Sequence, residues 1–177
     1  MIDPNIFLLA KLECDQIMLR QTALEDLEDL YKLGGFKEIW EQHSEKDRYK
    51  KEEFKQYFLN GLKNDLGCFT VVQRPDNKTV GWTRYYDLNH DNLTVRIGYT
   101  FIGKDYWGTT LNFNMKKLMI DFAFKHLKNV SFKIYNKNLR SQKAVLKLGA
   151  VFSGTIEDRN EYILSKKDWQ KTANSVL

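Results

Sequence analysis

The segment that most constrains the fold runs from Ile97 to Lys117 and reads IGYTFIGKDYWGTTLNFNMKK. Its first half predicts a strand, Gly108 predicts a turn, and the residues from Asn112 onward begin a helix. The first N–H groups of a helix lack internal partners and, with the helix dipole, attract an anion. Small Thr109 and Thr110 leave room for a pyrophosphate to approach the backbone. The segment therefore predicts a strand–turn–helix unit that can hold a phosphate.

A second segment, further along the chain, makes this interpretation more specific. Residues 138–151 read NLRSQKAVLKLGAV, with a polar helix start at Asn138 and Ser141, an apolar helix face, and Gly149 before another strand. One strand–turn–helix unit is common in α/β proteins and carries little information alone. The ordered pair resembles the GNAT acetyltransferases, specifically the branch of RimJ- and RimL-type ribosomal-protein N-acetyltransferases. The resemblance covers roughly residues 12–169.

The first half of the chain predicts a strand, helices and a meander. A strand is expected at 17–20, followed by a helix that starts with a capping box of Thr22 and Glu25 and ends at Gly34 and Gly35. One or two further helices, broken near 43–47, are expected between 37 and 62 and should cover one edge of the sheet. Three antiparallel strands are then expected at 68–73, 80–88 and 93–101, with turns at 75–78 and 89–92.

The second half predicts a long helix over 112–127, a strand at 130–134, a helix from Asn138, and a final hairpin of strands 151–156 and 162–164 turning at 158–160. The expected inward positions of the long helix are Leu111, Met115, Leu118, Met119, Phe122 and Ala123, and the outward ones are Asn114, Lys117, Asp121 and Lys125. This order is that of the GNAT acyl-CoA N-acyltransferase fold. We therefore expect an α+β protein with α/β/α layers, whose mixed, mostly antiparallel sheet is flanked by helices.

Length and composition indicate one domain spanning 1–177. A chain of 177 residues with 42% hydrophobic content can bury one good core but hardly two. No apolar run is long enough to span a membrane, no basic signal region opens the chain, and two distant cysteines suit a reducing compartment, so we expect a cytoplasmic protein. The 28 basic residues are interleaved with 23 acidic ones, which makes nucleic-acid binding a weak hypothesis. No metal site is expected.

The resemblance assigns a cofactor site for acetyl-CoA or coenzyme A to the turn. Residues 107–112 match the family's pyrophosphate motif, in which Trp107, Gly108 and Asn112 look like the RimJ/RimL branch. Thr110 departs from the usual glycine. A helix start needs negative φ, so we expect Thr110 to keep a helical φ and to donate its N–H or hydroxyl; the alternative is weaker binding. Thr109 and Leu111 complete the motif.

Further cofactor contacts follow from the same resemblance. The main chain of Phe101 and Ile102 would hydrogen-bond the pantetheine arm as a strand does. Asn138 would reach the pantetheine or cap its own helix. Arg140, with Lys137 and Lys143, would meet the 3′-phosphate, or each would be a solvated surface cation.

Catalysis is less clear from the sequence. Val145 stands where many GNAT enzymes carry a tyrosine acid, and Ser141 matches the serine that looks like the alternative donor in the RimL-like branch. Ser141 is therefore the predicted acid, unless it only bonds within the first helical turn or contacts CoA. Arg96 stands where that branch often has glutamate, so no base is assigned. Glu41, His43, His90, Glu157, Asp158 and a water relay all stay open, with both histidines expected in solvated surface segments.

An acceptor cleft is predicted on one face of the meander. Trp82, Arg84 and Tyr86 alternate onto one face, Tyr85 onto the other, and Tyr99 joins the first face from the next strand. Four of these side chains, Trp82, Arg84, Tyr86 and Tyr99, are assigned to substrate binding. The alternative is that they are core residues, as aromatic side chains in a half-buried sheet commonly are.

These features lead to a ranked set of hypotheses. The first is an acetyl-CoA-dependent N-acetyltransferase that acts by direct transfer to a primary amine, either a protein N-terminus or a small molecule. The second is an acyl-CoA-binding or sensing GNAT domain that has lost the chemistry. The third, a basic nucleic-acid-binding module, lacks a recognition helix or an aromatic RNA-binding signature. A homodimer is left open.

Overall fold

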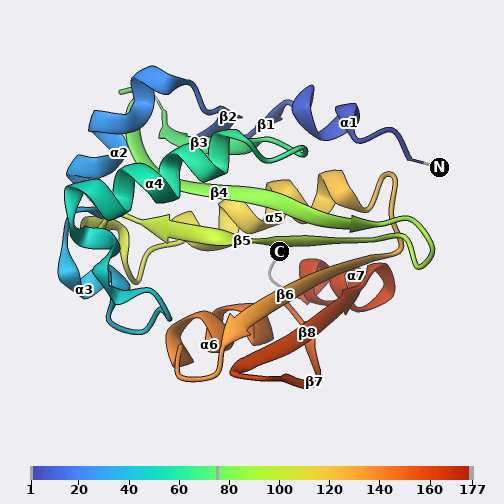
Figure 1. The fold of residues 1–177 in the computed structure, drawn as a ribbon. Helices are drawn as coiled ribbons and strands as arrows, with labels where there is room; N and C mark the ends of the chain where they lie inside the picture. Colours follow the sequence, from blue (N-terminus) through green and yellow to red (C-terminus); the bar gives the residue numbers. More distant parts are fainter. Residues whose placement is uncertain (1, 75, 176–177) are drawn as a thin grey trace.

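The computed structural model describes residues 2–74 and 76–175 and contains one eight-stranded sheet. The strand order is β1-β2-β3-β4-β5-β6-β8-β7, and every neighbouring pair is antiparallel except β5 and β6, which are parallel. The strands are β1 (Leu12–Glu13), β2 (Ile17–Gln21), β3 (Cys68–Gln73), β4 (Lys78–Asn89), β5 (Thr94–Ile102), β6 (Asn129–Tyr135), β7 (Val151–Ile156) and β8 (Arg159–Ser165). The fold is α+β, with a mixed, mostly antiparallel sheet as predicted (Figure 1).

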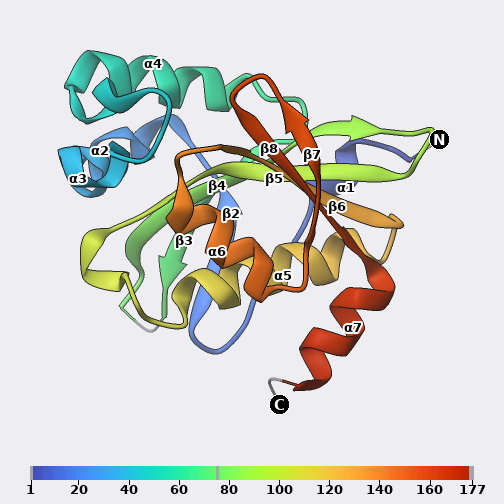
Figure 2. The same cartoon turned by 90° about the horizontal axis from the view of Figure 1, so that it is seen from below.

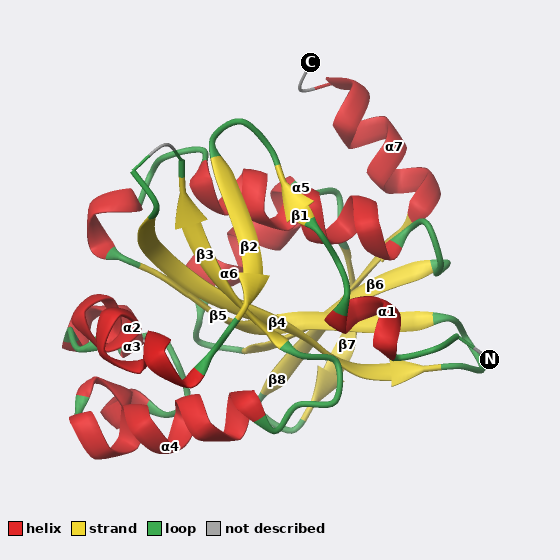
Figure 3. Ribbon diagram, turned by 90° about the horizontal axis from the view of Figure 1, so that it is seen from above, coloured by secondary structure: helices red, strands yellow, loops and turns green. Residues whose placement is uncertain are grey.

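Helices lie on both faces of this sheet. The α-helices are α1 (Asn5–Leu8), α2 (Leu27–Gly34), α3 (Lys37–Trp40), α4 (Lys51–Leu62), α5 (Leu111–Ala123), α6 (Leu139–Lys147) and α7 (Lys166–Ser175). There are three short 3₁₀ turns. Turn η1 (Leu24–Asp26) precedes α2, η2 (Lys46–Tyr49) precedes α4, and η3 (Lys104–Tyr106) precedes the loop into α5. Figures 2 and 3 show α2, α3 and α4 on one side of the sheet and α5 on the other. The 37–62 helices thus cover a face of the sheet rather than an edge.

Two apolar cores hold these layers together. On the α4 side, Phe54 and Phe58 pack with Trp40, Trp82 and Phe101. On the α5 side, the buried face of α5 packs against the sheet, and the core continues into α1 and α7; its members include Met115, Met119, Ile120, Tyr85, Phe7 and Trp169. The sheet separates the two cores, so successive residues of β4 serve different layers.

The pairing of β5 with β6 is short, and this opens the sheet. Only three residue pairs join the two strands, Thr94 with Asn129, Val95 with Val130 and Arg96 with Ser131. Beyond these pairs the strands diverge (Figure 1). The second half of β5 therefore has no strand partner on that side, and α5 and α6 begin close to this opening because each follows one of the two strands.

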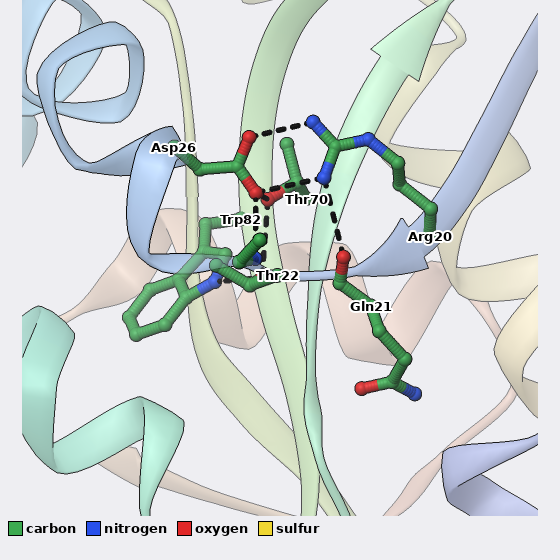
Figure 4. A network of polar contacts seen from close by, with 7 residues as sticks. Arg20, Gln21, Thr22, Asp26, Thr70 and Trp82 are labelled. Carbon is green, nitrogen blue, oxygen red and sulfur yellow. Dashed lines mark hydrogen bonds and ion pairs between the residues drawn. The ribbon is translucent and has the colours of Figure 1, made fainter.

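A buried carboxylate anchors the α2 layer to the sheet. The Asp26 oxygens accept two hydrogen bonds from Arg20, at 2.6 and 2.7 Å, and further bonds from the Ala23 N–H and the Thr70 hydroxyl (Figure 4). The predicted capping box of Thr22 and Glu25 is wrong by one residue, because Asp26 instead of Glu25 reaches back to the helix start. The Thr22 hydroxyl accepts a hydrogen bond from the Trp82 indole and lies at hydrogen-bond distance, 3.1 Å, from the Thr70 hydroxyl.

Most expected elements occur near their predicted positions, with five differences. The long helix ends at Ala123, and the last hairpin turns at Glu157, whose φ is +56°. Helices α1 and α7 and strand β1 were not expected. Part of the predicted 75–78 turn, Pro75, lies outside the described residues. Within the described chain, no helix has the length and apolarity needed to cross a membrane. No group of three or more His, Cys, Asp or Glu suited to a metal is found in those residues.

Candidate functional site

The turn before α5 has the geometry of an anion site. Gly108 has φ +77°, a conformation that residues other than glycine rarely adopt. A Cβ added there would meet no atom within 4 Å. Thr110, the N-cap residue of α5, keeps an ordinary helical conformation, with φ −75° and ψ −5°, as expected from its place at a helix start. The space beside the glycine is therefore open, and the threonine causes no backbone strain.

The first N–H groups of α5 are left for a ligand. The N-cap residue Thr110 makes no side-chain capping bond. The Thr109 hydroxyl accepts a hydrogen bond from the Leu111 N–H at 3.3 Å and donates to the Tyr106 carbonyl at 2.7 Å. The N–H groups of Asn112 and Phe113 have no partner among residues 2–74 and 76–175. Uncapped N–H groups at the start of a thirteen-residue helix favour a negative ligand, so this turn fits a pyrophosphate.

Trp107 and Arg140 form a contact across the opening between β5 and β6. The Trp107 indole donates to the Ile102 carbonyl at 3.2 Å, and the Arg140 guanidinium lies 4.1 Å from the centre of the Trp107 ring. Arg140 also donates to the Ile39 carbonyl at 3.2 Å, and burial lowers its pKa. Arg140 is therefore partly buried and held by Trp107 and the Ile39 carbonyl, and it is not a solvated surface cation. The Ile102 carbonyl, one of the groups assigned to pantetheine, thus already accepts a hydrogen bond from the Trp107 indole. The side chain of Phe101 packs in the α4-side core.

The start of α6 places Asn138 and Ser141 beside the same opening. The buried Asn138 carboxamide accepts a hydrogen bond from the Ser141 N–H at 3.1 Å, so Asn138 caps its own helix. The Ser141 hydroxyl has no hydrogen-bond partner in the described part of the chain and remains available as a donor. Val145 is buried in the core and supplies no acid.

Three strand side chains from the predicted acceptor face lie together. The Arg84 guanidinium lies 3.4 Å from the centre of the Tyr99 ring, and Tyr86 and Tyr99 are in edge contact. Tyr99 reaches this face because β5 bulges there: Trp82 pairs with Phe101 and Arg84 with Gly98, so Thr83 alone faces two residues of β5. Tyr99 has φ +51°, an unusual conformation for a bulky residue.

A cavity of about 710 Å³ opens over this bulge. Its walls come from the 44–48 segment, from Glu53, Gln56, Tyr57 and Asn60 of the α4 region, and from Arg84 and Tyr99. The Tyr57 hydroxyl donates to the Tyr99 carbonyl at 2.6 Å and so ties α4 to the bulge. Trp82 and Tyr86 share the face but do not line the cavity. Trp82 is a core residue, as the alternative interpretation had it.

The candidate bases separate by environment. His43 is half-buried against Trp40, and burial, with the charges of Arg48 and Arg140, lowers its pKa to about 4. The expectation of a solvated His43 is therefore wrong, and the ring is neutral at pH 7. Arg96, which replaces the family's glutamate, forms ion pairs with Asp87 and Glu161 at 3.0 and 2.8 Å.

Sequence reasoning missed Lys116, the buried cation of α5. It is 6% exposed, its amine lies 2.8 Å from the Thr100 hydroxyl, and burial lowers its pKa to about 7. Its spacing from Ile120 and Ala123, four and seven residues on, already placed it on the inward face of the helix. The cavity residues of the 44–48 segment were also missed, because a polar loop carries no periodic signal.

The comparison with protein families identifies the class. The family model described as "Acetyltransferase (GNAT) domain" matches residues 16–151. The chain belongs to the GNAT acetyltransferase family. No curated protein matches it.

Solved structures of GNAT proteins share the fold. A GCN5-related N-acetyltransferase from Brucella melitensis superimposes with a TM-score of 0.82 at 15% identity, covering 94% of this chain and 83% of that one. Spermidine N-acetyltransferase from Vibrio cholerae, in complex with CoA and spermine, gives 0.69 at 15% identity over 89% and 99%. A V. cholerae protein provisionally assigned as a ribosomal-protein-serine acetyltransferase gives 0.71 at 16% over 88% and 97%. At these identities the likeness shows the fold alone.

Proposed function

We propose that this protein is a cytoplasmic, acetyl-CoA-dependent N-acetyltransferase of the RimJ/RimL-like branch that acts on a primary amine. The observation that carries the proposal is the uncapped start of α5 beside Gly108, which supports pyrophosphate binding next to the opening between β5 and β6. Acetyl-CoA would supply the acetyl group as a thioester. Trp107, Gly108, Thr109, Thr110, Leu111 and Asn112 would hold its pyrophosphate, with Asn138, Arg140 and Ser141 on the facing side.

Transfer requires an uncharged amine, a donor to the thioester carbonyl and a proton for the departing thiolate. The new N–C bond forms as the C–S bond breaks; the amine loses one proton and the thiolate gains one. The bulge at Tyr99 leaves backbone groups of β5 outside the ladder, where they can polarise the carbonyl. We assign the proton for the thiolate to the Ser141 hydroxyl, which has no other partner in the described residues.

Binding of coenzyme A tests the cofactor assignment. Thr110→Trp should weaken the dissociation constant for CoA at least tenfold, about 1.4 kcal/mol, because the indole would cover the free N–H groups of α5. Isothermal titration calorimetry measures this, with Lys125→Trp at the exposed far end of the same helix region as the control. If the wild type fails to bind CoA or acetyl-CoA at millimolar ligand, the proposal is wrong.

Replacement of Ser141 tests the acid. Ser141→Ala should lower kcat about a hundredfold, with little change in KM for acetyl-CoA, because the Asn138 cap uses the Ser141 N–H and survives the substitution. Thiol release under saturating substrates measures kcat, and Ser153→Ala on the exposed β7 is the control. An unchanged kcat would reduce Ser141 to a capping residue.

The second hypothesis, an acyl-CoA-binding or sensing domain, is favoured by the absence of a tyrosine at Val145 and of a carboxylate at Arg96. It predicts CoA binding without turnover. Thiol release with any amine of a panel of N-terminal peptides and small amines, abolished in Thr110→Trp, would exclude it.

A further inference from the structure

Arg84 is a buried cation that no carboxylate neutralises. It is 7% exposed, and none of the ion pairs found in the described chain involves it. Its Nη1 lies 3.4 Å from the Asn60 carbonyl, a long contact, and its Nε is buried without any partner. By contrast Arg96, on the neighbouring strand, is bound by two carboxylates. A buried guanidinium normally has such a partner, since removal of a charge from water is costly.

The free charge faces the cavity over the bulge. Arg84 lines that cavity together with Tyr99, on whose ring its guanidinium rests. Two of the cavity's acidic residues are already bound to cations of their own: Glu45 to Arg48 at 2.6 Å and Asp47 to Lys50 at 3.1 Å. The third acidic residue of the lining, Glu53, forms no ion pair with Arg84 among those found in the described chain, so this guanidinium has no carboxylate in direct contact.

We propose that Arg84 binds an oxyanion, a carboxylate or a phosphate, carried by the amine acceptor itself. The planar fork of a guanidinium matches both groups. Because Arg84 lies at the bulge of β5, an oxyanion bound there holds its attached amine beside the β5 opening only if the acceptor is compact. The substrate class is therefore a small primary amine with an acidic group, such as an amino acid. A polyamine, which carries only positive charge, would leave Arg84 without a partner. This inference rests on the proposed function for the acetyl step but not for the binding step.

Paired acceptors test it by turnover. Thiol release from acetyl-CoA is measured with L-amino acids against their amides, O-phosphoethanolamine against ethanolamine, and spermidine. The wild type should favour at least one acidic acceptor over its neutral partner tenfold or more in kcat/KM; the carboxylate and phosphate pairs show which oxyanion is used. Arg84→Met should remove this preference, mainly by raising KM, and Arg84→Lys should keep part of it. The control is Arg74→Met, at an exposed ion pair with Glu13, which should leave the preference unchanged.

A binding measurement separates this inference from the acetyl transfer itself. N-acetyl-L-alanine and inorganic phosphate are titrated against wild type and Arg84→Met by calorimetry, with N-acetyl-L-alaninamide as the neutral probe. If either anion binds in an Arg84-dependent way but no acceptor is acetylated, the proposed acetyl transfer is wrong and the oxyanion site is supported. Four results would each overturn the inference. The wild type could use acidic and neutral acceptors equally, or its preference could persist in Arg84→Met. Spermidine could be the best acceptor, or neither anion could bind. If Arg84→Met fails to fold, the inference is tested on the wild type alone, by comparing its binding of N-acetyl-L-alanine with its binding of the neutral N-acetyl-L-alaninamide.

Discussion

Lys116→Met is expected to raise the free energy of unfolding at neutral pH and to remove a pH dependence that the wild type shows. Burial lowers the pKa of Lys116 from 10.5 to about 7, so the folded state disfavours the charged amine. Below pH 7 both folded and unfolded states hold the proton, and the penalty of burying the charge is fully present. Between pH 7 and 10.5 only the unfolded state keeps it. Wild-type stability should therefore rise by about 1.4 kcal/mol per pH unit over this window, about 5 kcal/mol in all.

Urea unfolding of wild type and Lys116→Met between pH 6 and 10 measures the effect as a difference. The two curves should converge as pH rises, because methionine fills a similar volume without a charge. Lys117→Met, one residue along, is the matched control: Lys117 is half-exposed and pairs with Asp121 at 2.6 Å, so its loss should leave the wild-type pH dependence in place. Parallel curves for wild type and Lys116→Met would contradict the assignment.

Asp26→Asn should destabilise the protein by about 3 kcal/mol. The substitution leaves the partly exposed Arg20 without its counter-charge and puts an amide N–H₂ where a carboxylate accepts several bonds (Figure 4). Burial alone would raise the pKa of Asp26, but the hydrogen bonds from Arg20, Ala23 and Thr70 outweigh it and hold the pKa below its usual range. Asp26 thus contributes stability that is present above the unfolded pKa and is lost as pH falls through the folded pKa.

Denaturant unfolding at pH 7 and in the acid range checks this prediction. Asp29→Asn, an exposed residue of α2 in an ion pair with Lys32, is the matched control and should change stability little. Asp26→Asn should also flatten the loss of stability at low pH. A midpoint equal to that of Asp29→Asn would show that the network does not hold α2 on the sheet.

The turn before α5 was predictable because its signals are local. A helical φ at Thr110 follows from its place at a helix start, and the positive φ of Gly108 follows from the turn that precedes it. The same holds for the helices and strands, whose apolar periodicity is written in neighbouring residues. The capping residue was misplaced by one position, since Thr22 and Asp26 both bond to groups of distant strands.

The acceptor face was only half predictable. The alternation of Trp82, Arg84 and Tyr86 follows from the period of a strand. The bulge at Tyr99, however, inverts the alternation of β5: Val95 and Ile97 face the α5-side core, whereas Phe101 faces the α4-side core. Strict period-two counting from Ile97 would place Tyr99 on the wrong face, and nothing in the local sequence marks the inversion.

The sequence alone determined the strand–turn–helix of residues 97–117, the order of the elements and the GNAT resemblance, because each depends on residues a few positions apart. Only the tertiary structure decided which charges are neutralised. Arg84 and Lys116 look like ordinary strand and helix cations in the sequence, and both are buried without a carboxylate partner in the described residues. Burial and pairing depend on which distant segments meet in the folded chain, and a local sequence pattern does not record this.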